Sequence, residues 1–104
     1  MNLELKGVHF EVKDETKEFI DKKIERIEYA HDMIVDLLLT MTKERRDFVC
    51  EVNINFRWGV SSHIKVRSFE LHEGIDKLFD KIDLKVKKEK SKVQEHKGAP
   101  AETE

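Results

Sequence analysis

The most regular pattern in the sequence is the alternation of apolar and polar residues between positions 48 and 56. The apolar phase consists of Phe48, Cys50, Val52, Ile54 and Phe56. Because successive side chains of a strand point to opposite faces, this period of two predicts a β-strand. One face of the strand belongs to the core, and the other face belongs to the surface.

A second strand is predicted to return antiparallel to the first. Trp58-Gly59 marks the turn, because glycine readily takes a left-handed backbone conformation. After the turn, polar and apolar positions alternate again: Ser62, Ile64, Val66 and Ser68 on one phase, His63, Lys65 and Arg67 on the other. The two segments together predict a β-hairpin with one exposed face.

Two further strands precede this hairpin. The first has a period of two that is interrupted at Gly7, where we expect an irregularity. Its apolar positions are Leu3, Leu5, Val8, Phe10 and Val12. Residues 34–42 are rich in β-branched and large apolar residues, which predicts a central strand. The charged run 43–47 is predicted to be the loop that follows it.

Two segments have helical periodicity. The first begins at Asp14, a candidate N-cap, and is expected to run to about Ala30. Its stripe consists of Phe19, Ile20, Ile24, Ile27 and His31. The second is expected to run from about Leu71 to Lys97. Its stripe consists of Ile75, Leu78, Phe79, Ile82, Val86 and Val93. Only one apolar position follows Val86, so we expect the last turns to project beyond the sheet or to fray.

The predicted element order is β-α-β-β-β-α, an α+β fold. Amphipathic helices need a sheet on which to bury their stripes, so we expect a four-stranded sheet with both helices packed on one face. The other face is predicted to be open to solvent. This layout is similar to double-stranded-RNA-binding domains. With 104 residues, we expect a single domain over residues 1–97 and a disordered tail over residues 98–104.

Charge is distributed unevenly along the chain, although the net charge is only -2. Residues 1–83 hold 14 basic against 18 acidic side chains, whereas residues 84–98 hold six lysines against two glutamates. An acidic body with one local basic surface is compatible with binding a polyanion through one edge.

Several classes of function find no support in the sequence. The single cysteine, Cys50, falls on the core phase of a strand and excludes an intramolecular disulfide. The five histidines show no metal-ligand spacing, and the four glycines form no phosphate-binding loop. No run approaches the roughly 18 apolar residues of a membrane span. We therefore expect a cytoplasmic protein that is not an enzyme and uses no metal or cofactor.

Basic side chains in three places are candidates for contact with RNA. The densest run lies in the second helix: Lys85, Lys87, Lys88, Lys90 and Lys92, with Lys81 one turn earlier. Five or six phosphate contacts would make binding steeply dependent on salt. The alternative is a solubilising helix end whose lysines favour the C-terminal dipole.

The other two places are less dense. Lys22, Lys23 and Arg26 lie on the exposed side of the first helix, where they either extend the basic edge or pair with Glu18, Asp21 and Glu25. On the exposed sheet phase, Arg57, His63, Lys65 and Arg67 form a possible platform, with Trp58 at the hairpin end and Arg45 and Arg46 in the facing loop. The alternative is a solvated sheet face with Trp58 packed against its neighbours.

Over residues 1–97 the chain resembles the ribosome hibernation-promoting factor and ribosome-associated inhibitor family, in its short form. The anchors are Met1-Asn2-Leu3-Glu4-Leu5-Lys6-Gly7, Val12-Lys13-Asp14-Glu15-Thr16 with Phe19 and Ile20, Lys23-Ile24-Glu25-Arg26-Ile27-Glu28, and Gly74-Ile75-Asp76-Lys77-Leu78-Phe79-Asp80-Lys81-Ile82 followed by Lys87, Lys88, Lys90 and Lys92. The chain departs from the family where it reads Glu70-Leu71-His72 in place of Asp-Met-Tyr, and Trp58-Gly59 in place of Gly-Gly.

The resemblance implies a bacterial stress-response factor that binds small-subunit ribosomal RNA in the channel used by messenger and transfer RNA. Such a factor inhibits translation in idle ribosomes by occupying that channel, and we expect it to be a monomer away from the ribosome. The residues expected to contact RNA are Lys22, Lys23, Arg26, Arg57, Lys65, Arg67, Lys81, Lys85, Lys87, Lys88, Lys90 and Lys92. The alternatives are a general double-stranded-RNA-binding module and a protein-interaction module without an RNA role.

Overall fold

The computed structural model describes the backbone of residues 1–98 and the side chains of residues 1–92. Its elements are β1 (Asn2–Val8), α1 (Asp14–Glu25), a 3₁₀ turn η1 (Glu28–Ala30), β2 (Ile34–Glu44), β3 (Asp47–Phe56), β4 (Ser61–Ser68) and α2 (Leu71–Gly98). The predicted order β-α-β-β-β-α is confirmed. Of the predicted tail, only Gly98 is described and it ends α2; residues 99–104 lie outside the described residues.

The four strands form one sheet in the order β1-β2-β3-β4. β1 and β2 run parallel and are connected through α1, as a parallel pair requires, whereas the other neighbouring pairs are antiparallel. Glu44 pairs with Asp47, so a loop of two residues joins β2 to β3. The loop predicted over residues 43–47 was therefore too long, because the ladder continues through the charged residues at both strand ends.

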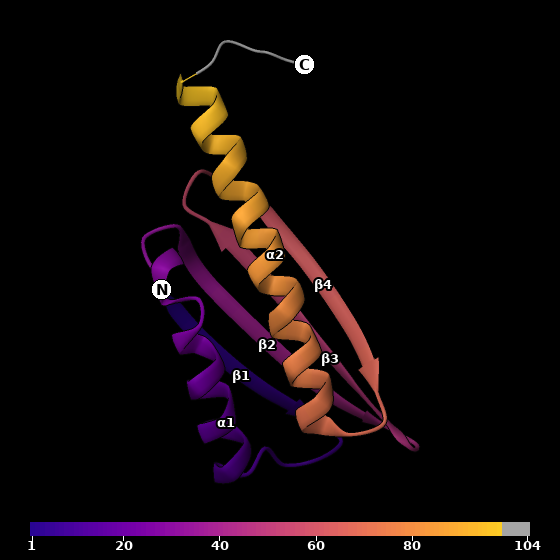
Figure 1. Ribbon diagram of the computed structural model, residues 1–104. Helices are drawn as coiled ribbons and strands as arrows, with labels where there is room; N and C mark the ends of the chain where they lie inside the picture. The colour runs from indigo at the N-terminus through magenta and orange to yellow at the C-terminus, as the bar shows by residue number, and fades with distance from the viewer. Residues whose placement is uncertain (99–104) are drawn as a thin grey trace.

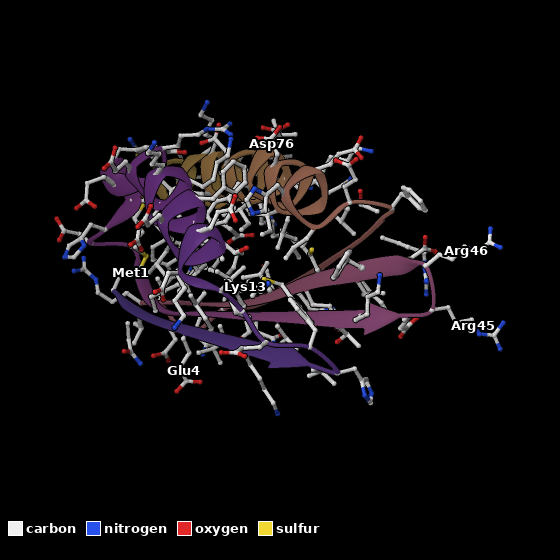
Figure 2. All side chains as sticks on the ribbon, turned by 90° about the horizontal axis from the view of Figure 1, so that it is seen from below. Met1, Glu4, Lys13, Arg45, Arg46 and Asp76 are labelled. Carbon is white, nitrogen blue, oxygen red and sulfur yellow. The ribbon has the colours of Figure 1, made fainter. Side chains whose placement is uncertain are left out.

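Both helices lie on the same face of the sheet, as predicted (Figure 1), and Figure 2 shows them together above the strands. The α2 stripe is fully buried at Ile75, Leu78, Phe79, Ile82 and Val86, and that of α1 at Ile20. Burying a side chain of this size contributes about 1.5–3 kcal/mol, so these stripes hold the helices to the sheet. Within residues 1–98, no helix or strand covers the opposite face of the sheet.

The first helix is shorter than its apolar pattern predicted. α1 ends at Glu25, and Ile27, with φ -113° and ψ 18°, interrupts the helix before η1. The chain has to turn back here to enter β2, and the short turn keeps Ile27 and Ala30 buried while His31 is exposed. His31 therefore does not belong to the stripe. The N-cap is Lys13 rather than Asp14, which is the first residue of the helix.

The first strand is also shorter than predicted, and regular at its glycine. Gly7 pairs in register with Met41, and the strand ends one residue later. A Cβ atom at Gly7 would lie 2.8 Å from both the Phe10 carbonyl oxygen and Val12 Cγ2. The glycine is needed because the following segment folds back over it, so that Phe10 and Val12 pack against the core from outside the strand.

A candidate nucleic-acid interface

Five lysines gather on the C-terminal half of α2, which extends past the sheet in Figure 1. We call Lys85, Lys87, Lys88, Lys90 and Lys92 the α2 lysine cluster. All but Lys85 are exposed. Because consecutive residues of a helix are about 100° apart, the charges surround most of the helix circumference and several can reach one anionic surface.

A buried carboxylate organises this cluster. Glu89 lies where the apolar stripe of α2 would continue after Val86, and only 3% of it is exposed. Its Oε2 atom lies 3.3 Å from Lys85 Nζ and 3.4 Å from Lys92 Nζ. Burial favours a higher pKa for Glu89, but the hydrogen bond from Lys85 and the charge of Lys92 outweigh it and lower the pKa. The carboxylate therefore stays charged and positions two of the lysines.

A hollow of about 600 Å³ lies beside the cluster, lined by Tyr29, Lys87, Lys90 and Ser91. The Tyr29 hydroxyl donates a hydrogen bond to Asp83, and Lys87 Nζ lies 3.1 Å from the other oxygen of that carboxylate. Burial, followed by the hydrogen bond and the charge of Asp83, raises the pKa of Tyr29 to about 12. A half-exposed aromatic ring next to two ammonium groups suits a stacked base and its phosphates.

Sequence reasoning missed Tyr29 as a site residue. It lies in η1, far from α2 along the chain, and it reaches the cluster only because the two helical segments pack side by side. The sequence signal available was the single tyrosine of the chain, located in a charged and otherwise unremarkable segment.

The basic residues of α1 form ion pairs with α2. Lys23 binds Asp76, and Arg26 Nη2 lies 3.0 Å from Asp80 Oδ1. The hydrogen bond from Lys23 holds the pKa of Asp76 below its usual range. The prediction was that these residues either extend the basic edge or pair within α1. Neither alternative included the partners on α2. In this conformation the charges of Lys23 and Arg26 are largely compensated.

Two other predicted helix residues remain open to solvent. Lys22 and Lys81 are exposed, and neither forms an ion pair with another side chain that the structure describes. Lys81 lies one turn before Lys85 on α2, so it continues the cluster toward the middle of the helix. Lys22 extends from α1 next to the pair of Lys23 and Asp76.

The predicted residues on the sheet lie away from the α2 lysine cluster, on the face opposite the helices. Arg67 is held by Glu44 at 2.9 Å and Asp47 at 3.3 Å, and Lys65 is exposed opposite Glu51. Carboxylates from three of the four strands, β1, β2 and β3, share this face: Glu4, Asp36, Glu44, Asp47 and Glu51. The open face is therefore mixed in charge rather than basic.

The end of the β3–β4 hairpin differs from the prediction. Arg57 is not on the sheet, because β3 ends at Phe56 and the Arg57 backbone N–H turns to donate to the Met33 carbonyl at 2.9 Å. Trp58 stacks on Phe56 with ring centroids 5.2 Å apart, as the packed alternative described. Gly59 has a φ of 87°, which confirms the left-handed turn.

Position 72, where the chain departs from the resembled family, faces inward. The His72 ring stacks on Phe19 with centroids 4.4 Å apart, and its Nε2 atom lies 3.0 Å from Thr16 Oγ1. This side chain therefore joins the start of α2 to α1.

Among the described residues, no group of His, Cys, Asp and Glu is arranged to hold a metal ion. None of the described helices has the length and hydropathy needed to cross a membrane.

Comparison with known proteins gives consistent matches. The family model described as sigma 54 modulation protein / S30EA ribosomal protein matches residues 3–94. A ribosome hibernation promoting factor of Pseudomonas putida is 27% identical over 94 residues, which are 90% of this chain and 91% of that protein. A protein of the same name from Klebsiella oxytoca is 23% identical over 96 residues, 92% of this chain and 100% of its own length.

Solved structures with this fold are also found. A ribosomal subunit interface protein from Coxiella burnetii has a TM-score of 0.80 at 19% identity, covering 88% of this chain and 99% of that one. The N-terminal domain of Protein Y from Thermus thermophilus has a TM-score of 0.75 at 20% identity, covering 85% and 98%. These likenesses confirm the fold.

Proposed function

The chain belongs to the sigma 54 modulation protein / S30EA ribosomal protein family, and we propose that it acts as a ribosome hibernation factor. In this proposal it binds small-subunit ribosomal RNA in the channel for messenger and transfer RNA and inhibits translation in idle ribosomes. Curated relatives named ribosome hibernation promoting factor align with about nine-tenths of the chain, which supports the assignment. The proposed location is the cytoplasm, and the proposed free state is a monomer.

The observation that carries the proposal is the α2 lysine cluster with its adjoining hollow. Four exposed ammonium groups lie on one projecting helix end, and Tyr29 supplies an aromatic surface beside Lys87 and Lys90. Charge-assisted contacts to phosphates release counterions and give affinity without base recognition. The proposed inhibition is competitive occupancy of an anionic channel, so it needs no chemical step.

The first test is co-sedimentation of the protein with purified small ribosomal subunits across a series of salt concentrations. The test variant is Lys87→Glu, Lys88→Glu, Lys90→Glu. The matched control is Lys6→Glu, Lys13→Glu, Lys17→Glu, which makes the same change in net charge at exposed positions outside the cluster. We expect the wild type and the control to pellet at low salt and the test variant to stay in the supernatant.

Either of two results would overturn the proposal. If the wild type does not pellet at low salt, the chain is not a ribosome-binding factor. If the control variant stays in the supernatant as completely as the test variant does, net charge rather than the α2 lysine cluster governs binding.

A second experiment separates this function from a general double-stranded-RNA-binding module. Transfer RNA bound to the small subunit should displace the protein if both occupy the same channel. A module that binds any duplex would remain on the particle, and it would bind free duplex RNA about as tightly. A protein-interaction module without an RNA role would show little dependence on salt in either experiment.

A further inference from the structure

The end of the molecule farthest from the α2 lysine cluster holds a second basic depression. Its volume is about 800 Å³, and it lies where the tip of the β2–β3 hairpin meets the residue after β1 and a side chain of β4. The lining residues are His9, Lys43, Glu44, Arg45, Arg46, Asp47 and Arg67. Figure 1 shows this tip and the C-terminal end of α2 at opposite ends of the fold.

The ion pairs at this tip leave an excess of positive charge. Arg67 engages both carboxylates, at 2.9 Å from Glu44 and 3.3 Å from Asp47. Arg45 and Arg46 are exposed, extend from the tip in Figure 2, and form no ion pair with any side chain that the structure describes. Four cations thus share the depression with two carboxylates, and both carboxylates already have a partner.

The backbone at the depression is strained. In the described part of the chain, only two non-glycine residues have a left-handed backbone: His9, with a φ of 68°, and Arg45, with a φ of 52°. Both residues line this depression. A two-residue hairpin loop ordinarily has Gly or Asn at such a position. Strained residues cluster at binding sites, where the surrounding structure maintains them for a purpose. Arginine at the first loop position serves the turn poorly, but it places a guanidinium at the tip.

Aromatic side chains pack closely behind the tip. Lys43 Nζ lies 4.3 Å from the centre of the Phe48 ring, and Phe10 contacts that ring edge-on with centroids 5.4 Å apart. Because β2 and β3 pair in register up to the loop, the tip is a rigid support for its two arginines. Rigid placement lowers the entropy lost when a ligand is bound.

We propose that this tip is a second phosphate-binding site, at which Arg45 and Arg46 grip the RNA backbone while the α2 lysine cluster holds the same RNA elsewhere. The planar fork of arginine matches the oxygens of a phosphate group and donates two parallel hydrogen bonds to it. An open depression at a protruding tip can be reached by an extended polyanion. The inference rests on the proposed function, which supplies the RNA.

The test variant is Arg45→Asn, Arg46→Gln, which removes two charges and places at position 45 a residue that tolerates the left-handed conformation. The matched control is Lys13→Gln, Lys17→Gln, two exposed lysines outside the depression. Binding to fluorescently labelled ribosomal RNA fragments is measured across a salt series. We expect the test variant to lower the slope of log affinity against log salt by about 1.5, and the control to leave it unchanged.

A second measurement keeps the two proposals distinguishable. Amide chemical shifts of residues 44–47 are followed while an RNA fragment, or inorganic phosphate alone, is added to the wild type and to the Lys87→Glu, Lys88→Glu, Lys90→Glu variant. We expect RNA to change the amide chemical shifts of residues 44–47 in both proteins. The variant should need a higher RNA concentration than the wild type. If the α2 variant binds RNA like the wild type but the hairpin variant does not, the α2 site fails and the hairpin site stands.

Three results would overturn the inference. The hairpin variant could keep the wild-type salt slope, RNA could leave the hairpin amides unshifted, or inorganic phosphate could shift them at the same phosphate concentration as RNA does. The last result would identify a site for small anions rather than for an extended RNA backbone. A melting curve for each variant checks that it is folded.

Discussion

Replacing the two aspartates that face α1 is expected to strengthen RNA binding while it weakens the fold. In the double variant Asp76→Asn, Asp80→Asn, the amides no longer neutralise Lys23 and Arg26. Both cations then become available to a polyanion lying across the two helices. If each one contacts a phosphate, the slope of log affinity against log salt steepens by about 1.5.

The loss of stability follows from the exposure of the same pairs. The aspartate side chains are 48% and 58% exposed, so solvent screens the attraction strongly. Exposed ion pairs contribute about 0.2–1 kcal/mol each, and we expect the double variant to lose about 1 kcal/mol of unfolding free energy. For a domain of this size, that corresponds to a fall in Tm of roughly 4–8 °C.

The assay combines fluorescence anisotropy of labelled RNA with thermal unfolding. The control is Asp21→Asn, Glu25→Gln, which makes the same change in net charge at exposed α1 positions that have no ion pair among the described side chains. We expect the control to tighten binding less and to keep its Tm. Equal tightening in both variants would refute the reasoning, because it would show that only net charge matters.

Three further results are expected. Gly7→Ala should lower the free energy of unfolding by about 1–3 kcal/mol in urea titrations, because the new methyl group meets Phe10 and Val12; an unchanged midpoint would contradict the contact. The pKa of Glu89 is lowered on folding, so its contribution to stability is present above the ordinary pKa of a glutamate and is lost as the pH falls through the lower folded pKa. Glu89→Gln should therefore flatten the acid side of the stability profile, and a profile parallel to the wild type would refute this. Cys50 is buried, and loss of solvation raises its pKa to about 11, so thiol reagents should label it only in denaturant; rapid labelling of the native protein would contradict its burial.

Strand and helix identity followed from local periodicity. The β3 alternation placed Cys50, Val52, Ile54 and Phe56 in the core, and the α2 stripe was buried as predicted from Ile75 to Val86. The side chain of Val93, the last predicted member of the stripe, lies outside the described residues. Burial of apolar surface is the dominant driving force of folding, so its period along the chain is read directly from the residues. Boundaries were less well predicted, as at His9 and Ile27, because local turns respond to where the next element has to begin.

Burial also has exceptions that no periodic pattern predicts. Val49 lies on the phase opposite the β3 core and is still only 1% exposed. Its register partners are Thr42 and Arg67, so neighbours on the open face cover it. A side chain in the middle of a sheet is shielded by the strands beside it, and those neighbours are known only once the register is known.

The sequence by itself determined the element order, the two faces of the sheet and the lysine-rich end of α2, because each depends on residues that are close along the chain. Only the tertiary structure decided which charges have partners outside their own helix or strand. Lys23 is paired with Asp76, 53 residues away, and Tyr29 meets Asp83 across the same helix interface. Salt screens exposed charges over roughly 8–10 Å in space, whatever their separation along the sequence. The folded packing therefore decides which basic residues can bind RNA and which are already neutralised.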